Sequence, residues 1–280
     1  MVALIVIGGA TRVMEAGLAC PDWPLCYGTL LPGRQMNLQV FLEWFHRLDA
    51  FLVGVALLIQ QLICLRWASR LPRWLPWLAA LPLVLVALQG ALGALTVTHL
   101  LASATVTAHL GTALLLLVAL SGLHQLLASR PEQAPPLWWT LLSLIALVAL
   151  FGQCLLGATM ASQWAAEACL QAGDSCRWLL AHRLGAQPAA VAVVLLAVSS
   201  LMAGPAVRPL MPYVLVSALL VAAQVALGIL TLRLQLQVPA ITIAHQLVAA
   251  LLVALTGAIA TRALSSSFRL RPSRLEVIHG

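Results

Sequence analysis

Four histidines stand in two pairs with the same spacing, and each lies inside a strongly apolar stretch of the sequence. His46 and His109 are 63 residues apart, and so are His182 and His245. Polar side chains are costly inside a bilayer and commonly mark functional sites. Two imidazoles that face each other across a helical bundle are what axial ligation of heme iron requires. The spacing therefore predicts that all four histidines ligate heme iron.

The histidines could instead serve packing or bind a bare metal ion. A histidine in a membrane helix can simply form a hydrogen bond between helices, although four of them at matched spacing and depth favour a shared purpose. A bare metal ion is the closer rival, but no carboxylates or cysteines gather at the same depth to complete a tetrahedral or octahedral shell. Because heme needs only two ligands from the protein, heme ligation is the preferred interpretation.

Charged residues near the histidines differ between the two pairs. Arg47 and Arg183 directly follow the first histidine of each pair and could neutralise heme propionates, or extend to the membrane surface. Glu43 precedes His46 by three residues, hence on the same helical face, whereas Leu179 holds the corresponding position in the second pair. This asymmetry predicts that one half does chemistry and the other carries electrons. The competing interpretation is a structural ion pair between Glu43 and Arg47.

The composition places these residues in a membrane. Of 280 residues, 62% are hydrophobic and 8% are charged, whereas about a quarter of a soluble domain is charged. All basic residues are arginines scattered at the ends of apolar runs, which argues against a nucleic-acid partner despite the net charge of +7. We expect an all-α integral membrane protein of eight transmembrane helices, the first of them short or truncated. Their expected ranges are 1–13, 41–67, 74–98, 103–128, 137–161, 178–203, 209–233 and 239–263.

An internal repeat divides the expected helices into two similar four-helix units. Four spans per half is an even number, so both halves share one orientation and form two pseudo-symmetric four-helix bundles about an axis along the membrane normal. We therefore expect an N-terminal half over 1–128, a cytoplasmic linker over 129–136, a C-terminal half over 137–264 and a cytoplasmic tail over 265–280. The repeated segments are Leu88–Thr96 with Ala223–Thr231, Gly9–Thr11 with Gly157–Thr159, and His46–Leu48 with His182–Leu184.

The arginines also predict an orientation. Nine of the fifteen collect on one side of the membrane, and the positive-inside rule puts that side, with both termini, in the cytoplasm of a plasma-type cell membrane. The two longest loops then face outward, and each contains two cysteines. Because the outside is oxidising, we expect disulfides between Cys20 and Cys26 and between Cys169 and Cys176. Zinc binding by the four cysteines is the alternative, but neither pair has CxxC spacing.

Three segments of the N-terminal half resemble the heme A synthase family. They are Gly8–Arg12, Gly17–Gly28 with its Cys-Pro-Asp-Trp-Pro-Leu-Cys core, and Glu43–Arg47 with its Glu-x-x-His-Arg pattern. The resemblance extends over all eight expected helices, and the chain departs from the family mainly at its abbreviated N-terminus. The resemblance implies oxidation of the C8 methyl of heme O to the formyl group of heme A, by successive hydroxylations, in support of cytochrome oxidase assembly.

The same resemblance implies a role for each half. In the family the C-terminal half holds a b-type heme, which maps onto His182 and His245. The N-terminal half takes substrate heme O near His46 and His109, and the position of Glu43 is implicated in catalysis. Heme O synthase, an electron donor, the lipid bilayer and further copies of the chain are the expected partners. A diheme b-type electron carrier and a heme transporter or chaperone are the alternative functions.

Overall fold

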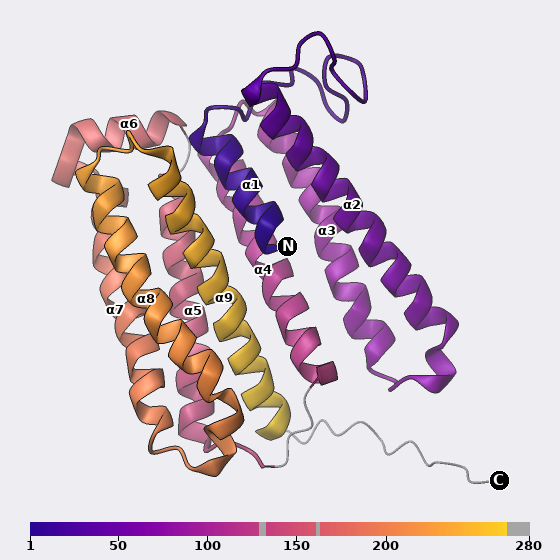
Figure 1. The fold of residues 1–280 in the computed structure, drawn as a ribbon, viewed down its shortest axis with the longest axis vertical. Coiled ribbons are helices and arrows are strands. Elements are labelled where there is room, and N and C mark those ends of the chain that lie inside the picture. The colour runs from indigo at the N-terminus through magenta and orange to yellow at the C-terminus, as the bar shows by residue number, and fades with distance from the viewer. Residues whose placement is uncertain (129–132, 161–162, 268–280) are drawn as a thin grey trace.

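The computed structural model of the chain describes residues 1–128, 133–160 and 163–267. Within these ranges the fold is a bundle of long helices joined by loops and by three short 3-10 turns, η1 to η3 (Figure 1). The helices are α1 (Val2–Val13), α2 (Leu38–Arg66), α3 (Leu75–Thr98), α4 (Ser103–Ala128), α5 (Leu137–Thr159), α6 (Gln163–Ala172), α7 (Arg177–Ser200), α8 (Met211–Arg233) and α9 (Pro239–Ser267).

Seven of the described helices, α2 to α5 and α7 to α9, are long and apolar enough to cross a membrane. The remaining expected span, α1, has 12 residues. At 1.5 Å per residue it is about 18 Å long, shorter than a hydrocarbon core of about 30 Å. Within the described residues seven helices therefore have spanning length, and the expected count of eight is not confirmed. The expected ranges agree with the observed bounds to within four residues.

The connection between α5 and α7 contains a helix that the sequence did not predict. Figure 1 shows α6 lying across one end of the bundle. It has ten residues, too few to cross the bilayer. The connection ends at Cys176, whose Sγ accepts a hydrogen bond from the N–H of Leu179 at 3.4 Å and so caps the start of α7.

Consecutive spanning helices pack against one another within each half, but the two halves close differently. In the C-terminal half α5 also packs against α9, whereas in the N-terminal half α1 barely touches α4. The halves meet where α9 packs against α4 and α1, and where α4 packs against α5. Figure 1 accordingly shows α2 and α3 on one side of α1, α4 and α9, with α7 and α8 on the other.

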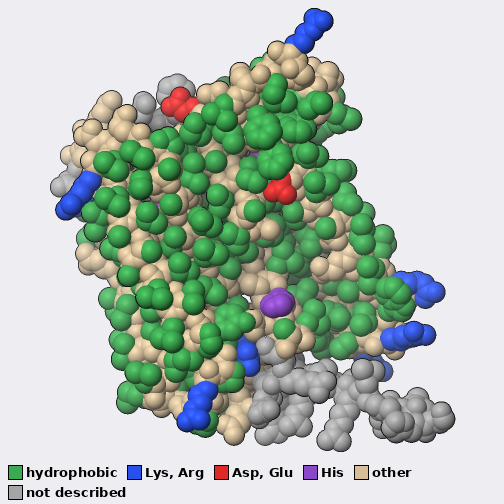
Figure 2. Space-filling model, viewed as in Figure 1, with side chains coloured by type: hydrophobic (Ala, Val, Ile, Leu, Met, Phe, Trp, Pro, Cys, Tyr) green, Lys and Arg blue, Asp and Glu red, His purple; other side chains and the backbone are tan. Residues whose placement is uncertain are grey.

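The best-buried part of the bundle is the C-terminal half together with the contact between the halves. Half of the most apolar window of α9 is buried inside the protein, against 11% for α2. The visible face in Figure 2 is covered by hydrophobic side chains, with arginines near its two ends. This distribution suits a surface in contact with lipid. The largest fully buried side chains of the main core include Trp139, Leu196, Leu252 and Ile259.

Candidate heme-binding site

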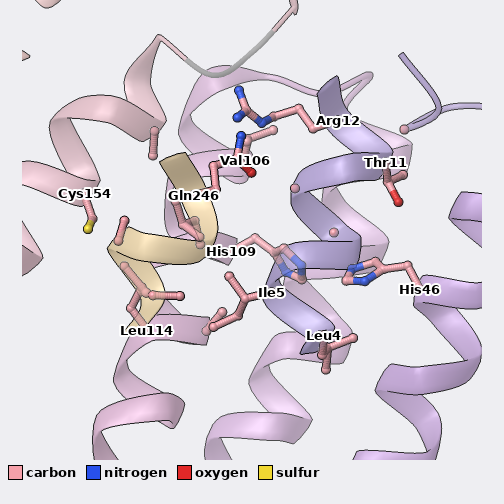
Figure 3. Close-up of a pocket in the computed structure, with 18 of the residues that line it drawn as sticks. Leu4, Ile5, Thr11, Arg12, His46, Val106, His109, Leu114, Cys154 and Gln246 are labelled. Atoms are coloured by element: carbon pink, nitrogen blue, oxygen red, sulfur yellow. The ribbon is translucent and has the colours of Figure 1, made fainter. Parts of the chain in front are cut away.

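The structure brings the four histidines together as the two pairs that their spacing predicted. His46 on α2 faces His109 on α4, and the ring centroids lie 6.5 Å apart with the planes at 82° (Figure 3). His182 on α7 and His245 on α9 repeat this arrangement at 6.5 Å and 78°. An imidazole nitrogen bonds a metal ion at about 2.0 Å and lies about 1.1 Å from its ring centroid, so two imidazoles on opposite sides of one ion have centroids about 6.2 Å apart. Each pair therefore fits around one iron.

The donor set of each pair also suits heme. Among the residues that the structure describes, no group of three or more His, Cys, Asp or Glu side chains comes together. Each pair therefore offers two imidazoles, and heme iron takes its other four ligands from the macrocycle. Zinc and other bare ions need more protein ligands than this.

Each histidine ring lies over a glycine of the preceding spanning helix. A Cβ at Gly8 of α1 would lie only 2.7 Å from Cε1 of His46. The ring can take this position because glycine has no side chain. Three more glycines face the other rings, two of them tightly and Gly93 at an ordinary contact distance. For His109, His182 and His245 the glycine and the distance from its added Cβ to Cε1 are Gly93 at 3.5 Å, Gly157 at 3.0 Å and Gly228 at 3.1 Å.

Three of these glycines are preceded, four residues earlier, by a glutamine that reaches the same histidine. Residues four apart share a helical face. The Gln-x-x-x-Gly pattern therefore presents a side-chain amide, and the space left by a missing side chain, to one histidine. This pattern was not predicted from the sequence, although two copies lie within the repeated segments. The contacts are Gln89 Nε2 to the main-chain oxygen of His109 at 2.6 Å, Gln153 Nε2 to the main-chain oxygen and Nδ1 of His182 at 2.7 and 3.0 Å, and Gln224 Nε2 to Nε2 of His245 at 3.3 Å.

The helix before His46 breaks the pattern. Leu4 stands four residues before Gly8, at the place that glutamine holds in the three other helices. His46 is consequently the one ring of the four that lacks a glutamine on the preceding helix. The two pairs have the same geometry and differ in this glutamine contact.

Both pairs line one cavity of about 2240 Å³. Ordinary ligand pockets reach about 1,000 Å³, so this cavity has room for two large ligands. Most of its wall is apolar, and Leu4, Ile5 and Leu114 are among the side chains that surround the N-terminal pair in Figure 3. An apolar wall excludes water from a bound macrocycle and its iron.

Glu43 is buried, with 4% of its surface exposed, and both of its carboxylate oxygens have partners. Oε1 forms an ion pair with Arg47, one turn later on α2, and Oε2 accepts a hydrogen bond from the N–H of Cys20 at 2.8 Å. Arg47 in turn donates to the main-chain oxygens of Asp22 and Leu25, both at 2.6 Å. The ion pair that the sequence offered as the competing interpretation is therefore present. It fastens the outer loop to α2, while Glu43 and Arg47 also line the cavity.

The corresponding position in the second half has a different chemistry. Leu179 is buried and packs against Cys169 and Cys176. Arg183 lines the cavity from α7. The half that contains Glu43 thus has an additional polar network that the other half lacks at this position.

The two cysteine pairs occur as the sequence predicted. Cys20 is joined to Cys26 with an S–S distance of 1.96 Å, and Cys169 is joined to Cys176 at 1.95 Å. Both disulfides lie at the end of the bundle where the histidines approach the outer helix ends. Each one closes a short loop beside the cavity, whose wall includes Cys26 and Cys169.

The fold and the paired histidines define a multi-pass helical membrane protein with two heme-sized sites in one cavity. A family profile described as "Cytochrome oxidase assembly protein" matches residues 1–256. The chain belongs to this family.

Several curated relatives share one name, Heme A synthase. The relative from Shewanella oneidensis is 33% identical over 195 residues, which cover 59% of this chain and 55% of the relative. Another from Rhizorhabdus wittichii is 30% identical over 310 residues, covering 90% of this chain and 87% of the relative. A third, from Bacillus pumilus, is 30% identical over 114 residues, 40% of this chain and 36% of the relative. The chain spans about half the length of most of the curated relatives it matches.

Proposed function

We propose that this chain acts as a heme A synthase, which oxidises the C8 methyl of heme O to a formyl group for cytochrome oxidase assembly. Family membership and the names of the relatives support the proposal. The observation that carries it is the difference between two histidine pairs of equal geometry. An enzyme on heme needs one site that keeps its ligand and one that exchanges it, whereas a diheme carrier needs two equal sites.

We assign a permanently bound heme b to His182 and His245. A glutamine, Gln153 or Gln224, reaches each of these rings, and α5 packs against α9 to close this half. Arg183 lines the cavity and offers a positive charge for a propionate. The heme, when bound, supplies one-electron transfer to the neighbouring site.

We assign substrate heme O to His46 and His109. The short α1 barely touches α4, so the N-terminal half is less closed than its counterpart. His46 also lacks the glutamine contact that the other three histidines have. A site that takes up substrate and releases product benefits from a less closed half, so we take His46 and His109 as the substrate pair.

We propose that Glu43 completes the catalytic set with His46 and His109. Its carboxylate lies one turn from His46 and lines the cavity, where it can hold a proton or orient the reacting methyl. Arg47 and the N–H of Cys20 fix its position. Arg47, bound to Glu43 and to the outer loop, would contribute its charge to the propionate side from there.

We also propose the arrangement in the membrane. Both termini lie in the cytoplasm of the cell membrane, and the disulfide loops face outward, as the arginine distribution favours. The pseudo-symmetric halves cover 1–128 and 137–264, and the equal centroid distances of their histidine pairs support the symmetry. Half of the linker (129–136) and most of the tail (265–280) lie outside the described residues. Heme O synthase, an electron donor and further copies of the chain are the proposed partners.

Coexpression with heme O synthase tests the activity. Cells that make no heme A of their own should accumulate it when they contain both proteins, as measured by extraction and mass spectrometry of the pigments. The matched control is His109→Ala, brought to the same level in the membrane. Heme O without heme A, at a normal level of the wild-type protein, would overturn the proposal.

A further inference from the structure

Gln246 brings a buried amide to the boundary between the two halves. It follows His245 on α9, and its Nε2 is shielded from solvent without a hydrogen-bond partner among the described residues. It lines the shared cavity, and Figure 3 shows its side chain extending from α9 toward α1, beside Val106 and Arg12. A buried donor without an acceptor is unfavourable, and a ligand oxygen would satisfy it.

The amide of Gln246 rests on α1. A Cβ at Gly9 would lie 1.9 Å from Oε1 of Gln246, so the missing side chain is what admits the amide. The preceding residue, Gly8, makes the same kind of room for the ring of His46. Successive glycines of α1 therefore accommodate one polar group from each half, and both groups line the cavity beside α1.

The amide has no counterpart in the N-terminal half. The repeat aligns His245 with His109, and the residue after His109 is Leu110. The side chain of Leu110 also lines the cavity, but it is apolar. If the glutamine had a structural role common to both halves, glutamine would be expected at position 110 as well as at Gln246. The donor is therefore specific to the site next to α1, where we have placed the substrate.

We propose that Gln246 is a positioning residue that donates a hydrogen bond from Nε2 to the oxygen placed on C8 of the substrate. The inference rests on the proposed function. Heme O has a methyl group at C8, so this bond forms only after the first hydroxylation. The hydrogen bond then holds the resulting alcohol in the site for the second hydroxylation. The oxygen of the formyl group accepts the same hydrogen bond.

Two variants remove the contact by different routes. Gln246→Leu reproduces the residue found at Leu110 and deletes the donor. Gly9→Ala leaves the glutamine in place but fills the space that its amide occupies. The matched controls are Gln60→Leu on α2, outside the cavity wall, and Gly152→Ala on α5, where an added Cβ meets no atom within 4 Å.

The measurement is equilibrium binding to the purified protein that retains its resident heme. Heme O and heme A differ only at C8, so the ratio of their dissociation constants isolates the formyl oxygen. Both variants should weaken heme A binding about fivefold, as for the loss of one neutral hydrogen bond. Heme O binding and the spectrum of the resident heme should stay unchanged. In cells with heme O synthase, the variants should raise the ratio of the C8 alcohol to heme A.

Two results would overturn the inference. An equal loss of affinity for heme O and heme A would show that Gln246 serves packing or bonds a group that both hemes share, and unchanged affinities would show that the amide bonds to water. The proposed function fails separately. The wild-type chain could make no heme A while both variants lose the selective binding of heme A. The proposed oxidation would then be wrong, but the contact of Gln246 would stand.

Discussion

The carboxylate of Glu43 and the guanidinium of Arg47 form an ion pair one turn apart on α2, and the pair joins the cavity wall to the outer loop. Arg47 reaches two main-chain oxygens of that loop, and Glu43 receives the N–H of Cys20. The same carboxylate is therefore placed both to hold the loop and to face the cavity. A substitution that keeps the shape of the Glu43 side chain is needed to separate its structural role in the loop from its role in the cavity.

Glu43→Gln should lower heme A production at least about tenfold, roughly 1.4 kcal/mol in the barrier, because the amide cannot take up or release a proton. An amide oxygen can still accept the N–H of Cys20, so the loop should stay in place. The heme held by His182 and His245 should be retained in full. Pigment analysis and the reduced spectrum of the purified variant measure the two effects. A normal heme A yield would mean that the carboxylate is only the structural partner of Arg47.

His182→Ala and His245→Ala should each remove most of the tightly bound heme from the purified protein. Loss of one axial imidazole leaves an open coordination position and an apolar gap at the ring. The heme-to-protein ratio and the reduced b-type spectrum report the loss. His124→Ala is the control, because this exposed histidine on α4 lies outside the cavity wall. Normal reduced spectra for both variants would refute the assignment.

Gly8→Ala and Gly157→Ala should have opposite effects. The added Cβ would lie 2.7 Å from the ring of His46 in the first variant and 3.0 Å from the ring of His182 in the second, so each displaces one ligand. We expect Gly8→Ala to abolish heme O binding while the protein keeps its full content of the heme bound by His182 and His245. We expect Gly157→Ala to lower the content of that bound heme. Gly152→Ala, with open space around its added Cβ, should bind both normally. Identical losses in the two variants would contradict the division of roles.

Asp22 should make the outer loop sensitive to acid. Hydrogen bonds from the N–H groups of Gly28 and Tyr27 hold the pKa of its carboxyl below the usual 3.8. The stabilisation that follows from a lowered pKa is present above 3.8 and is lost as the pH falls through the still lower value of the folded protein. Hydrogen exchange of these two amides should thus be slower in the wild type than in Asp22→Asn at neutral pH. The difference should disappear in strong acid, and a difference that persists there would refute the role of the carboxylate.

Hydropathy and the repeat were sufficient to predict the helices and the histidine pairs. Spans of apolar residues fix where a chain crosses a bilayer, so the expected ranges match α2 to α5 and α7 to α9 closely. Long apolar stretches do not predict α6 (Gln163–Ala172), because a short helix in a loop contains no stretch of that kind. They also do not distinguish lipid-facing from buried helices, since both surfaces are apolar. The central position of α9 could therefore not be predicted.

The details of the site depended on contacts between helices far apart in the sequence. Gly8 and Gly9 could be recognised as part of a motif, but not as the places against which His46 and Gln246 pack. The repeat aligns Gly9 with Gly157, whereas the glycine that faces His46 is Gly8, one position earlier. The ion pair of Glu43 was an open alternative, because a spacing of four residues permits the contact without requiring it.

The packing of α1 against α9 has a consequence for biosynthesis. Translation delivers α1 well before α9, and until α9 is made α1 has only α2 as an extensive partner. The wall around His46 is therefore incomplete until α9 is inserted. Because α9 also carries His245, its insertion completes the surroundings of both histidine pairs in one event.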